Sequence, residues 1–194
     1  MSGDGARVAY PLFQEGDGGS CPTSPLQFKI VEVEVRRAQK LNQEWHSRLP
    51  IYETGSCLNA TVCFAAIYEN RFYAVAIWSH PVARLLPQKT WLELRRLAIA
   101  PDAPKNTASR VISIMARIIK KKFPGVNKLI SCQDTEVHLG TIYKASGWEI
   151  GNEHSGGSWC RPNSQNKSGT PRNRPDLNKA VAPKIRWEKD LKRR

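Results

Sequence analysis

The strongest constraint on the fold comes from residues 94–132, which change from a strand-like to a helix-like pattern and back. Residues 94–99 form an apolar run that stops before Pro101 and Pro104. In residues 110–123 the apolar side chains recur at the spacing of one helix face, at Val111, Ile114, Met115, Ile118 and Ile119. A Pro-Gly pair ends this helix, and residues 128–132 follow as a second short apolar run. The pattern predicts a strand, a helix and a strand in succession.

The segments around this unit add further strands and helices. In chain order they are a strand at 28–35, a helix at 36–45, a hairpin at 61–78 that turns at Glu69-Asn70-Arg71, a strand at 91–99, a helix from Asp134 or Thr135 to about residue 145, and strands at 148–152 and 185–188. Gly147 is expected to end the last helix. The order predicts a single α/β (α+β) domain, in which helices flank a mixed central sheet.

Composition limits the cellular setting. The chain of 194 residues contains no apolar run of about 20 residues, so no transmembrane helix is expected. The Gly-rich, acidic N-terminus lacks the pattern of a signal peptide, which favours an intracellular protein. Five cysteines without a C-x-x-C pair indicate reduced thiols. Residues 1–25 are predicted to be disordered, residues 26–154 to form the folded domain, and residues 155–194 to form a basic loop and a C-terminal strand or tail.

The charge points to a polyanionic partner. The formal net charge is +13, and residues 161–194 hold eleven Lys or Arg against three Asp or Glu. Such a bias is typical of proteins that bind nucleic acid, although a solvated basic tail would have the same composition. If the partner is DNA, the expected phosphate contacts are Arg161, Arg172, Arg174, Lys120 and Lys121.

The turn before the central helix is a candidate anion site. A helix start leaves about four backbone N–H groups unpaired, and the positive end of the helix dipole lies there as well. Asn106, Thr107 and Ser109 supply polar side chains at this point, and Lys105 supplies a charge. The same residues suit a simple helix cap, so this segment alone does not decide between the two roles.

Residues 141–149, TIYKASGWE, resemble the LYxxxGF ending of the GNAT acyltransferase superfamily. The resemblance implies two parallel strands that splay apart, a cofactor pyrophosphate on the N-terminus of the intervening helix, and a cleft into which Tyr143 points. The chain departs from the superfamily at its phosphate loop, usually Q/R-x-x-G-x-G/A. Residues 104–109 contain no glycine, and glycine is what lets a backbone approach a phosphate closely.

Longer blocks resemble the phage Mom family, whose members are GNAT-like. These blocks are RRLAIAPDAPKNTASR and ISCQDTEVHLGTIYKASGW, with shorter matches at EWHSRLP and KIRWEKDL, over roughly residues 28–191. The resemblance implies an enzyme of the host cytoplasm that converts adenine in double-stranded DNA to N6-carbamoylmethyladenine and so protects phage DNA from restriction. It also hints at ferrous iron, for which His46 is the candidate ligand. It leaves open a homodimer.

The product restricts the donor. The carbamoylmethyl group joins N6 through a methylene carbon, which ordinary acetyl transfer from a thioester does not produce. The donor is therefore either acetyl-coenzyme A used in an unusual way or a glycine-derived compound such as a charged tRNA. Both are polyanions, so the charge of the chain does not separate them.

Each candidate catalytic residue has a structural alternative. Asp134 follows a strand and suits a base for the N6 proton or a cap of the next helix. Tyr143 suits a general acid, a donor to the base edge or a core tyrosine. His46 suits a base, a DNA contact, a metal ligand or a capping histidine. Arg95 and Arg96, consecutive on a strand, are expected to face opposite sides, and Arg96 is the expected anion partner in the cofactor site.

Two other functions fit parts of this pattern. One is a conventional GNAT N-acetyltransferase that acts on a protein or a small amine, although the missing phosphate-loop glycines disfavour it. The other is a nucleic-acid-binding protein without catalytic activity. In that case, Asp134→Ala changes DNA binding little and no modified base is formed.

Overall fold

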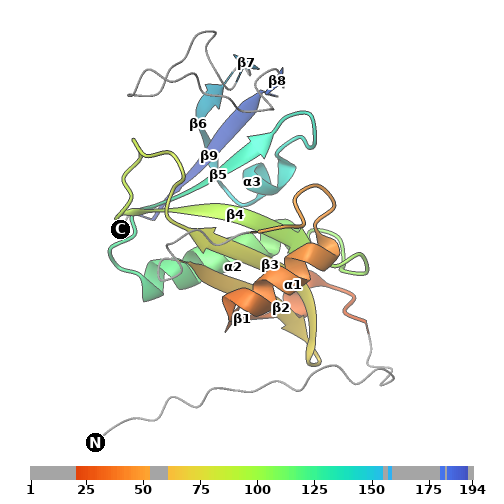
Figure 1. Cartoon of the computed structure of the whole chain (residues 1–194). Coiled ribbons are helices and arrows are strands. Elements are labelled where there is room, and N and C mark those ends of the chain that lie inside the picture. Colours follow the sequence, from red (N-terminus) through yellow and green to blue (C-terminus); the bar gives the residue numbers. More distant parts are fainter. Residues whose placement is uncertain (1–20, 53–60, 155–156, 159–179, 182, 192–194) are drawn as a thin grey trace, which may run out of the picture.

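The computed structural model describes residues 21–52, 61–154, 157–158, 180–181 and 183–191. Its elements are η1 (Pro25–Gln27), β1 (Lys29–Val33), α1 (Val35–Trp45), β2 (Val62–Tyr68), β3 (Arg71–Ser79), β4 (Trp91–Ile99), α2 (Thr107–Lys122), β5 (Lys128–Asp134), α3 (Thr141–Ala145), β6 (Glu149–His154), β7 (Gly157–Ser158), β8 (Ala180–Val181) and β9 (Lys184–Asp190). Seven strands form one mixed sheet in the order β1-β2-β3-β4-β5-β9-β6. The predicted α/β fold is confirmed (Figure 1).

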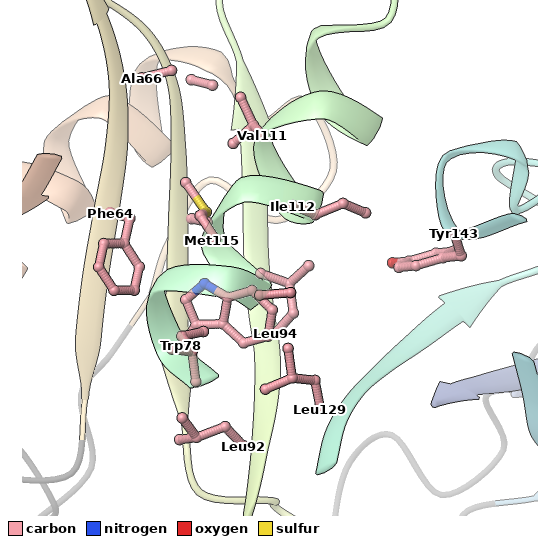
Figure 2. Packing of buried hydrophobic residues seen from close by; sticks show 14 of the residues in the cluster. Phe64, Ala66, Trp78, Leu92, Leu94, Val111, Ile112, Met115, Leu129 and Tyr143 are labelled. Carbon is pink, nitrogen blue, oxygen red and sulfur yellow. The ribbon is translucent and has the colours of Figure 1, made fainter. Parts of the chain in front are cut away.

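The sheet has a core on each face. On one face, α1 covers β2, β3 and β4, and Leu41 packs against Val75 and Ile77. On the other face, α2 contributes fully buried Val111, Met115 and Ile119, which were expected from the sequence, and also Ile112, which was not. Ile114 and Ile118, expected on the same stripe, are only half-buried. Figure 2 shows this second core, in which Met115 and Ile112 lie over Trp78, Leu94 and Leu129. The two helices therefore fix the sheet from opposite sides.

The strands β4 and β5 separate along their length. Their parallel pairing extends only from Trp91 opposite Lys128 to Leu94 opposite Ser131. Beyond this point β4 continues to pair with β3, whereas β5 pairs along its whole length with β9. Figure 1 shows the two strands diverging toward their carboxyl ends. The split that the resemblance implies is thus present between the second halves of β4 and β5.

A β-bulge corrects the prediction that Arg95 and Arg96 face opposite sides. Leu94 pairs with Trp78 and Arg96 with Ile77, so Arg95 has no partner on β3. Leu94 and Leu97 both pack in the core under α2, and therefore the two arginines between them both lie on the face of α1. Arg95 accordingly meets Glu93 on that face, at 3.4 Å.

The last strand of the sheet is inserted between two earlier ones. The strand predicted at 185–188 is confirmed as β9, which pairs antiparallel with β5 on one side and β6 on the other. The hairpin is also confirmed, although its turn contains only Glu69 and Asn70, both with positive φ. Gly147, with φ of 67°, follows α3 as expected.

The prediction that Asp134 or Thr135 caps the helix before residue 145 is wrong. The Oδ1 of Asp134 accepts a hydrogen bond from the Glu136 N–H at 3.0 Å, which closes a local turn instead. The helix α3 begins only at Thr141, and Gly140 precedes it in a left-handed conformation. The short side chain of Asp134 satisfies the nearest N–H, which belongs to the turn and not to the helix.

Three cysteines of the described segments, Cys21, Cys63 and Cys132, are free thiols, as predicted. The predictions for Cys57, Cys160 and residues 1–20 lie outside the described residues. Within the described part of the chain, none of the helices has the length and apolar character needed to cross a lipid bilayer.

Candidate functional site

Tyr143 lies at the point where β4 and β5 separate. Its Oη is 2.9 Å from the Oγ of Ser131, and that Oγ donates to the Leu94 carbonyl at 3.4 Å. Ser131 and Leu94 are the last pair of the parallel ladder. In Figure 2, the Tyr143 side chain points toward the core under α2, and its hydroxyl group is at the end that faces this core. The side chain that the resemblance implies for the cleft is therefore aimed at the apex of the split.

The environment of Tyr143 keeps the phenol protonated. Burial raises the pKa of Tyr143 above 10.0, and the hydrogen bond with Ser131 only partly opposes this. The Tyr143 and Ser131 hydroxyls are joined by a hydrogen bond of 2.9 Å in which either oxygen can be the donor. The phenol therefore suits a proton donor near neutral pH better than a base.

We expect this raised pKa to affect stability at alkaline pH. The folded chain retains the Tyr143 proton at a pH at which the unfolded chain has lost it, so the free energy of unfolding falls as pH rises above about 10. In urea titrations, the difference between wild type and Tyr143→Phe should stay constant up to pH 9. Above pH 10 it should change in favour of the variant. Parallel curves from pH 8 to 11 would contradict the assignment.

The ring of Tyr143 is held by a group of buried side chains. Trp187 stacks on it with ring centroids 5.4 Å apart and an interplanar angle of 17°. The Trp187 Nε1–H donates to the Oε1 of Gln133 at 2.6 Å, and the Nε2 of Gln133 donates to the His138 carbonyl. Gln133 and Trp187 are each 2 % exposed. The phenol position is thus fixed by β5, β9 and the loop before α3.

A cavity of about 250 Å³ lies between the start of α2 and α3. Its lining includes Asn106, Thr107 and Ser109 from the expected anion site, together with Thr141 and Ile142 from α3. Lys105 does not line this cavity, although it is exposed in the turn beside it. The structure therefore brings together three of the residues that the sequence singled out at this helix start.

The turn before α2 reaches a glycine-like conformation without glycine. Asn106 has φ of 65°, in the left-handed region that asparagine tolerates better than most residues. Thr107 Oγ1 donates to the Pro104 carbonyl at 2.6 Å and Ser109 Oγ to the Asn106 carbonyl at 3.1 Å. Because both hydroxyl protons are used within the turn, an anion would be held here mainly by backbone N–H groups.

A substitution of Asn106 tests this interpretation. In Asn106→Ala, the methyl side chain retains the cost of the left-handed conformation and lacks the local polar group, so we expect the free energy of unfolding to fall by about 1 kcal/mol. Asn106→Gly should stay within about 0.5 kcal/mol of wild type. Urea denaturation of the three proteins measures both values. Equal losses in the two variants would show that the side chain, and not the backbone, matters.

Arg96 and His46 lie together on the other face of the sheet. The Arg96 guanidinium lies 5.5 Å from the centroid of the Tyr52 ring and donates to the Arg95 carbonyl at 2.7 Å. Its buried Nε has no hydrogen-bond partner among the described residues. Burial lowers the pKa of His46, and the nearby Arg96 charge lowers it further. Arg96 is therefore on the α1 face, whereas the cavity expected to use it lies between α2 and α3.

The structure gives His46 a capping role. Its Nδ1 accepts a hydrogen bond from the Leu49 N–H at 3.2 Å, so a neutral imidazole carries its proton on Nε2. That tautomer leaves no free ring lone pair for a metal. Among the described residues, no three His, Cys, Asp or Glu side chains are grouped closely enough to hold a metal ion. These residues do not fit the iron site that the resemblance implies.

Asp134 ends β5 on the far arm of the split. Because side chains alternate along a strand, Asp134 and Ser131 lie on different faces of β5. On the neighbouring strand β9, Asp134 pairs with Lys184. His138 connects Asp134 with Tyr143: its ring centroid is 6.2 Å from that of Tyr143. Burial lowers the pKa of His138, and the Asp134 charge opposes that shift. Asp134 and Tyr143 therefore lie on opposite faces of β5, and neither of them lines the cavity at the start of α2.

The expected DNA contacts are only partly described. Lys120 and Lys121 lie in the last turn of α2, about 20 Å along the helix axis from the cavity at its start. Arg161, Arg172 and Arg174 fall outside the described residues. Sequence reasoning missed Ser131, Gln133, Gly140 and Trp187, although Trp187 lies within the block KIRWEKDL.

Known proteins match this fold and this sequence. A crystal structure of a Bacillus subtilis acetyltransferase in complex with CoA has a TM-score of 0.55 and 15 % identity, with 85 % of this chain and 99 % of that chain covered. The ribosomal-protein-S18-alanine N-acetyltransferase from Escherichia coli has a TM-score of 0.55 and 13 % identity, with 86 % and 96 % covered. The aminoglycoside 6'-N-acetyltransferase from Enterococcus faecium has a TM-score of 0.53 and 13 % identity, with 86 % and 98 % covered.

At such identities the likeness concerns the fold, which is that of the GNAT acetyltransferases. No curated protein matches the chain significantly. The model of the Mom protein family, however, matches residues 27–178, which is most of the chain and contains both arms of the split and the whole of α2. The chain therefore belongs to the Mom protein family.

Proposed function

We propose that this protein is a phage transferase that converts adenine in double-stranded DNA to N6-carbamoylmethyladenine and so protects that DNA from restriction. Membership of the Mom family supports DNA modification, and the GNAT fold supports group transfer. The net charge of +13 suits a polyanionic substrate. The observation that carries the proposal is the position of the protonated Tyr143 hydroxyl at the apex of the split, beside Ser131 and Leu94.

A phosphate-bearing donor fits the residues at the start of α2. The cavity there has room for a phosphate group, and the N–H groups of a helix start favour an anion. Asn106 and Ser109 border this place, as does Ile142 of α3, the helix that carries Tyr143. Acetyl-coenzyme A and a charged tRNA both carry the required phosphates. When bound, the donor supplies the carbamoylmethyl carbon.

Two residues of the chain would then each carry out one proton transfer. The adenine N6 is a weak nucleophile because its lone pair is delocalised into the ring, and in a duplex the base must leave the stack to react. Asp134 would accept the N6 proton as the new N–C bond forms. With a glycine-derived ester as donor, the new bond forms at the ester carbonyl carbon, the ester C–O bond breaks, and Tyr143 would give its Oη proton to the oxygen that leaves with the bonding electron pair. The glycyl group has the same atoms as the carbamoylmethyl group, so an internal rearrangement without a further reactant would then join it to N6 through the methylene. The hydrogen bond with Ser131 holds the phenol in position beforehand.

Nucleoside mass analysis tests this proposal. Plasmid DNA from bacteria that express the full chain should contain an adenosine heavier by one carbamoylmethyl group, and Asp134→Ala should lose it. Glu136→Ala is the control, because Glu136 carries a nearby exposed carboxylate and meets Asp134 only through its own backbone N–H. An unchanged adenosine peak from folded wild-type protein would overturn the proposal.

The GNAT fold also favours a second candidate, a conventional N-acetyltransferase that uses acetyl-CoA. This candidate predicts release of free CoA when the purified chain is mixed with acetyl-CoA and small amines or basic peptides. Thiol release with amines, combined with unmodified plasmid adenosine, would favour it over DNA modification.

A further inference from the structure

The loop after α1 exposes two apolar side chains beside the split. Leu49 is 51 % exposed and Ile51 is 69 % exposed, on either side of Pro50. A single exposed apolar residue is ordinary on a protein surface. Here two of them share a short loop with Arg48, which is exposed as well. The loop therefore presents an apolar tip with a cation next to it.

Residues 46–52, the part of this loop that the structure describes, are held by side chains of α1. Asn42, which is fully buried on α1, donates from Nδ2 to the carbonyls of Leu49 at 3.0 Å and Pro50 at 2.8 Å. Gln39 Nε2 donates to the Tyr52 carbonyl at 2.8 Å. Burying an amide side chain is costly unless it is hydrogen-bonded. The Nδ2 of Asn42 is satisfied by the two loop carbonyls, whereas its Oδ1 has no partner among the described residues. The fold thus uses a buried asparagine to keep the tip pointing outward.

The apolar tip, Leu49 and Ile51, lies near the second half of β4, where this strand has separated from β5. The guanidinium of Arg96, two residues beyond the point of separation, stacks on Tyr52, the last described residue of this stretch. On the opposite arm, the loop after β5 exposes Leu139, at 84 %. Figure 1 shows both loops, in orange and in cyan, toward the end of the sheet at which β4 and β5 have diverged. Each arm of the split therefore carries an exposed apolar side chain.

We propose that Leu49 and Ile51 are a wedge that enters duplex DNA next to the target adenine and fills the space that its base leaves. The inference rests on the proposed function. A base that leaves the stack exposes its neighbours, and an apolar side chain inserted there replaces part of the lost stacking. The duplex is the fitting occupant because the chain is strongly cationic and Arg48 lies beside the tip to meet a phosphate. A loop held in this way loses little freedom when it inserts.

The test compares two double variants of the full chain. The first is Leu49→Ala with Ile51→Ala. The matched control is Val82→Ala with Leu85→Ala, because these side chains are 62 % and 100 % exposed on the loop before β4, at the other end of that strand. Each protein is mixed with duplex fragments in which 2-aminopurine replaces a small share of the adenines. Its fluorescence rises when the base leaves the stack.

Wild type and the control variant should raise the 2-aminopurine fluorescence. The Leu49→Ala, Ile51→Ala variant should lose at least about 80 % of that rise. Its dissociation constant for the duplex should stay within about threefold of the wild-type value. A first variant that retains the full rise would overturn the wedge. So would equal losses in both variants, or a loss explained by tenfold weaker binding.

A second measurement separates the wedge from the proposed function. Lysates of expressing cells, which contain the donor, are given linear plasmid DNA in its duplex or its heat-denatured form. The first variant should form at least about tenfold less modified adenosine than wild type on duplex and remain within about threefold on denatured DNA. Equal losses on both forms would contradict a wedge. No modified adenosine from wild type would instead remove the proposed function.

Discussion

Replacing Tyr143 with phenylalanine is expected to lower the rate of DNA modification by about 10²–10⁴-fold, the usual contribution of a general acid, while the chain stays folded. Phenylalanine keeps the stacking on Trp187 and loses only the hydroxyl that meets Ser131 at 2.9 Å. The burial that keeps this phenol protonated is the reason to expect a proton donor. The measurement is the content of modified adenosine formed per hour, at equal amounts of soluble protein.

Tyr73→Phe is the matched control for this prediction. Tyr73 is also a buried tyrosine under α2, but its ring packs against Phe28 at 5.3 Å, on a different part of the sheet. We expect this variant to keep its activity within about twofold of wild type. Ser131→Ala should fall between the two, because it removes the group that orients the phenol and leaves the phenol itself. Activity of Tyr143→Phe within a few-fold of wild type would contradict the role as an acid.

The largest effect on stability is expected from Gly140→Ala. Gly140 has φ of 70°, and a Cβ at this position would lie 2.4 Å from the Oε1 of Gln133 and 2.7 Å from the Cζ2 of Trp187. The left-handed conformation costs an alanine about 1–2 kcal/mol, and overpacking in a core costs about 1–3 kcal/mol. We expect the free energy of unfolding to fall by about 2–5 kcal/mol, measured by urea denaturation followed through tryptophan fluorescence.

Gly125→Ala provides the comparison, because a Cβ there would meet no atom within 4 Å and φ is not positive. Its free energy of unfolding should stay within about 0.5 kcal/mol of wild type. If Gly140→Ala is as stable as Gly125→Ala, the tight packing around Trp187 is not what fixes Tyr143. A destabilised but folded Gly140→Ala should also lose activity, because Trp187 must move to admit the methyl group.

Sequence reasoning succeeded where the signal is local. The apolar stripe of α2 and the alternation of β1 depend on the helix and strand periods alone, and the structure confirms both elements. The motif around Tyr143 located a side chain whose hydroxyl lies at the apex of the split. These features need no knowledge of which strands become neighbours.

The features that were missed depend on partners far apart in the sequence. The bulge at Arg95 arises from the register of β4 against β3, which periodicity within β4 does not reveal. The grouping of His46, Tyr52 and Arg96 needs the packing of α1 on the sheet. The late start of α3 follows from the tight contact of Gly140 with Gln133 and Trp187, residues of two other strands.

The insertion of β9 between β5 and β6 has a consequence for how the molecule assembles. The strands β1 to β5 are consecutive neighbours, so this part of the sheet forms without waiting for residues much later in the chain. The strand β6 pairs with β9 alone, and β9 must first close a segment of about fifty residues to reach β5. During synthesis on the ribosome, β9, which carries Trp187, is therefore the last strand to join the sheet, and the packing around the Tyr143 phenol is completed only after the rest of the sheet has formed.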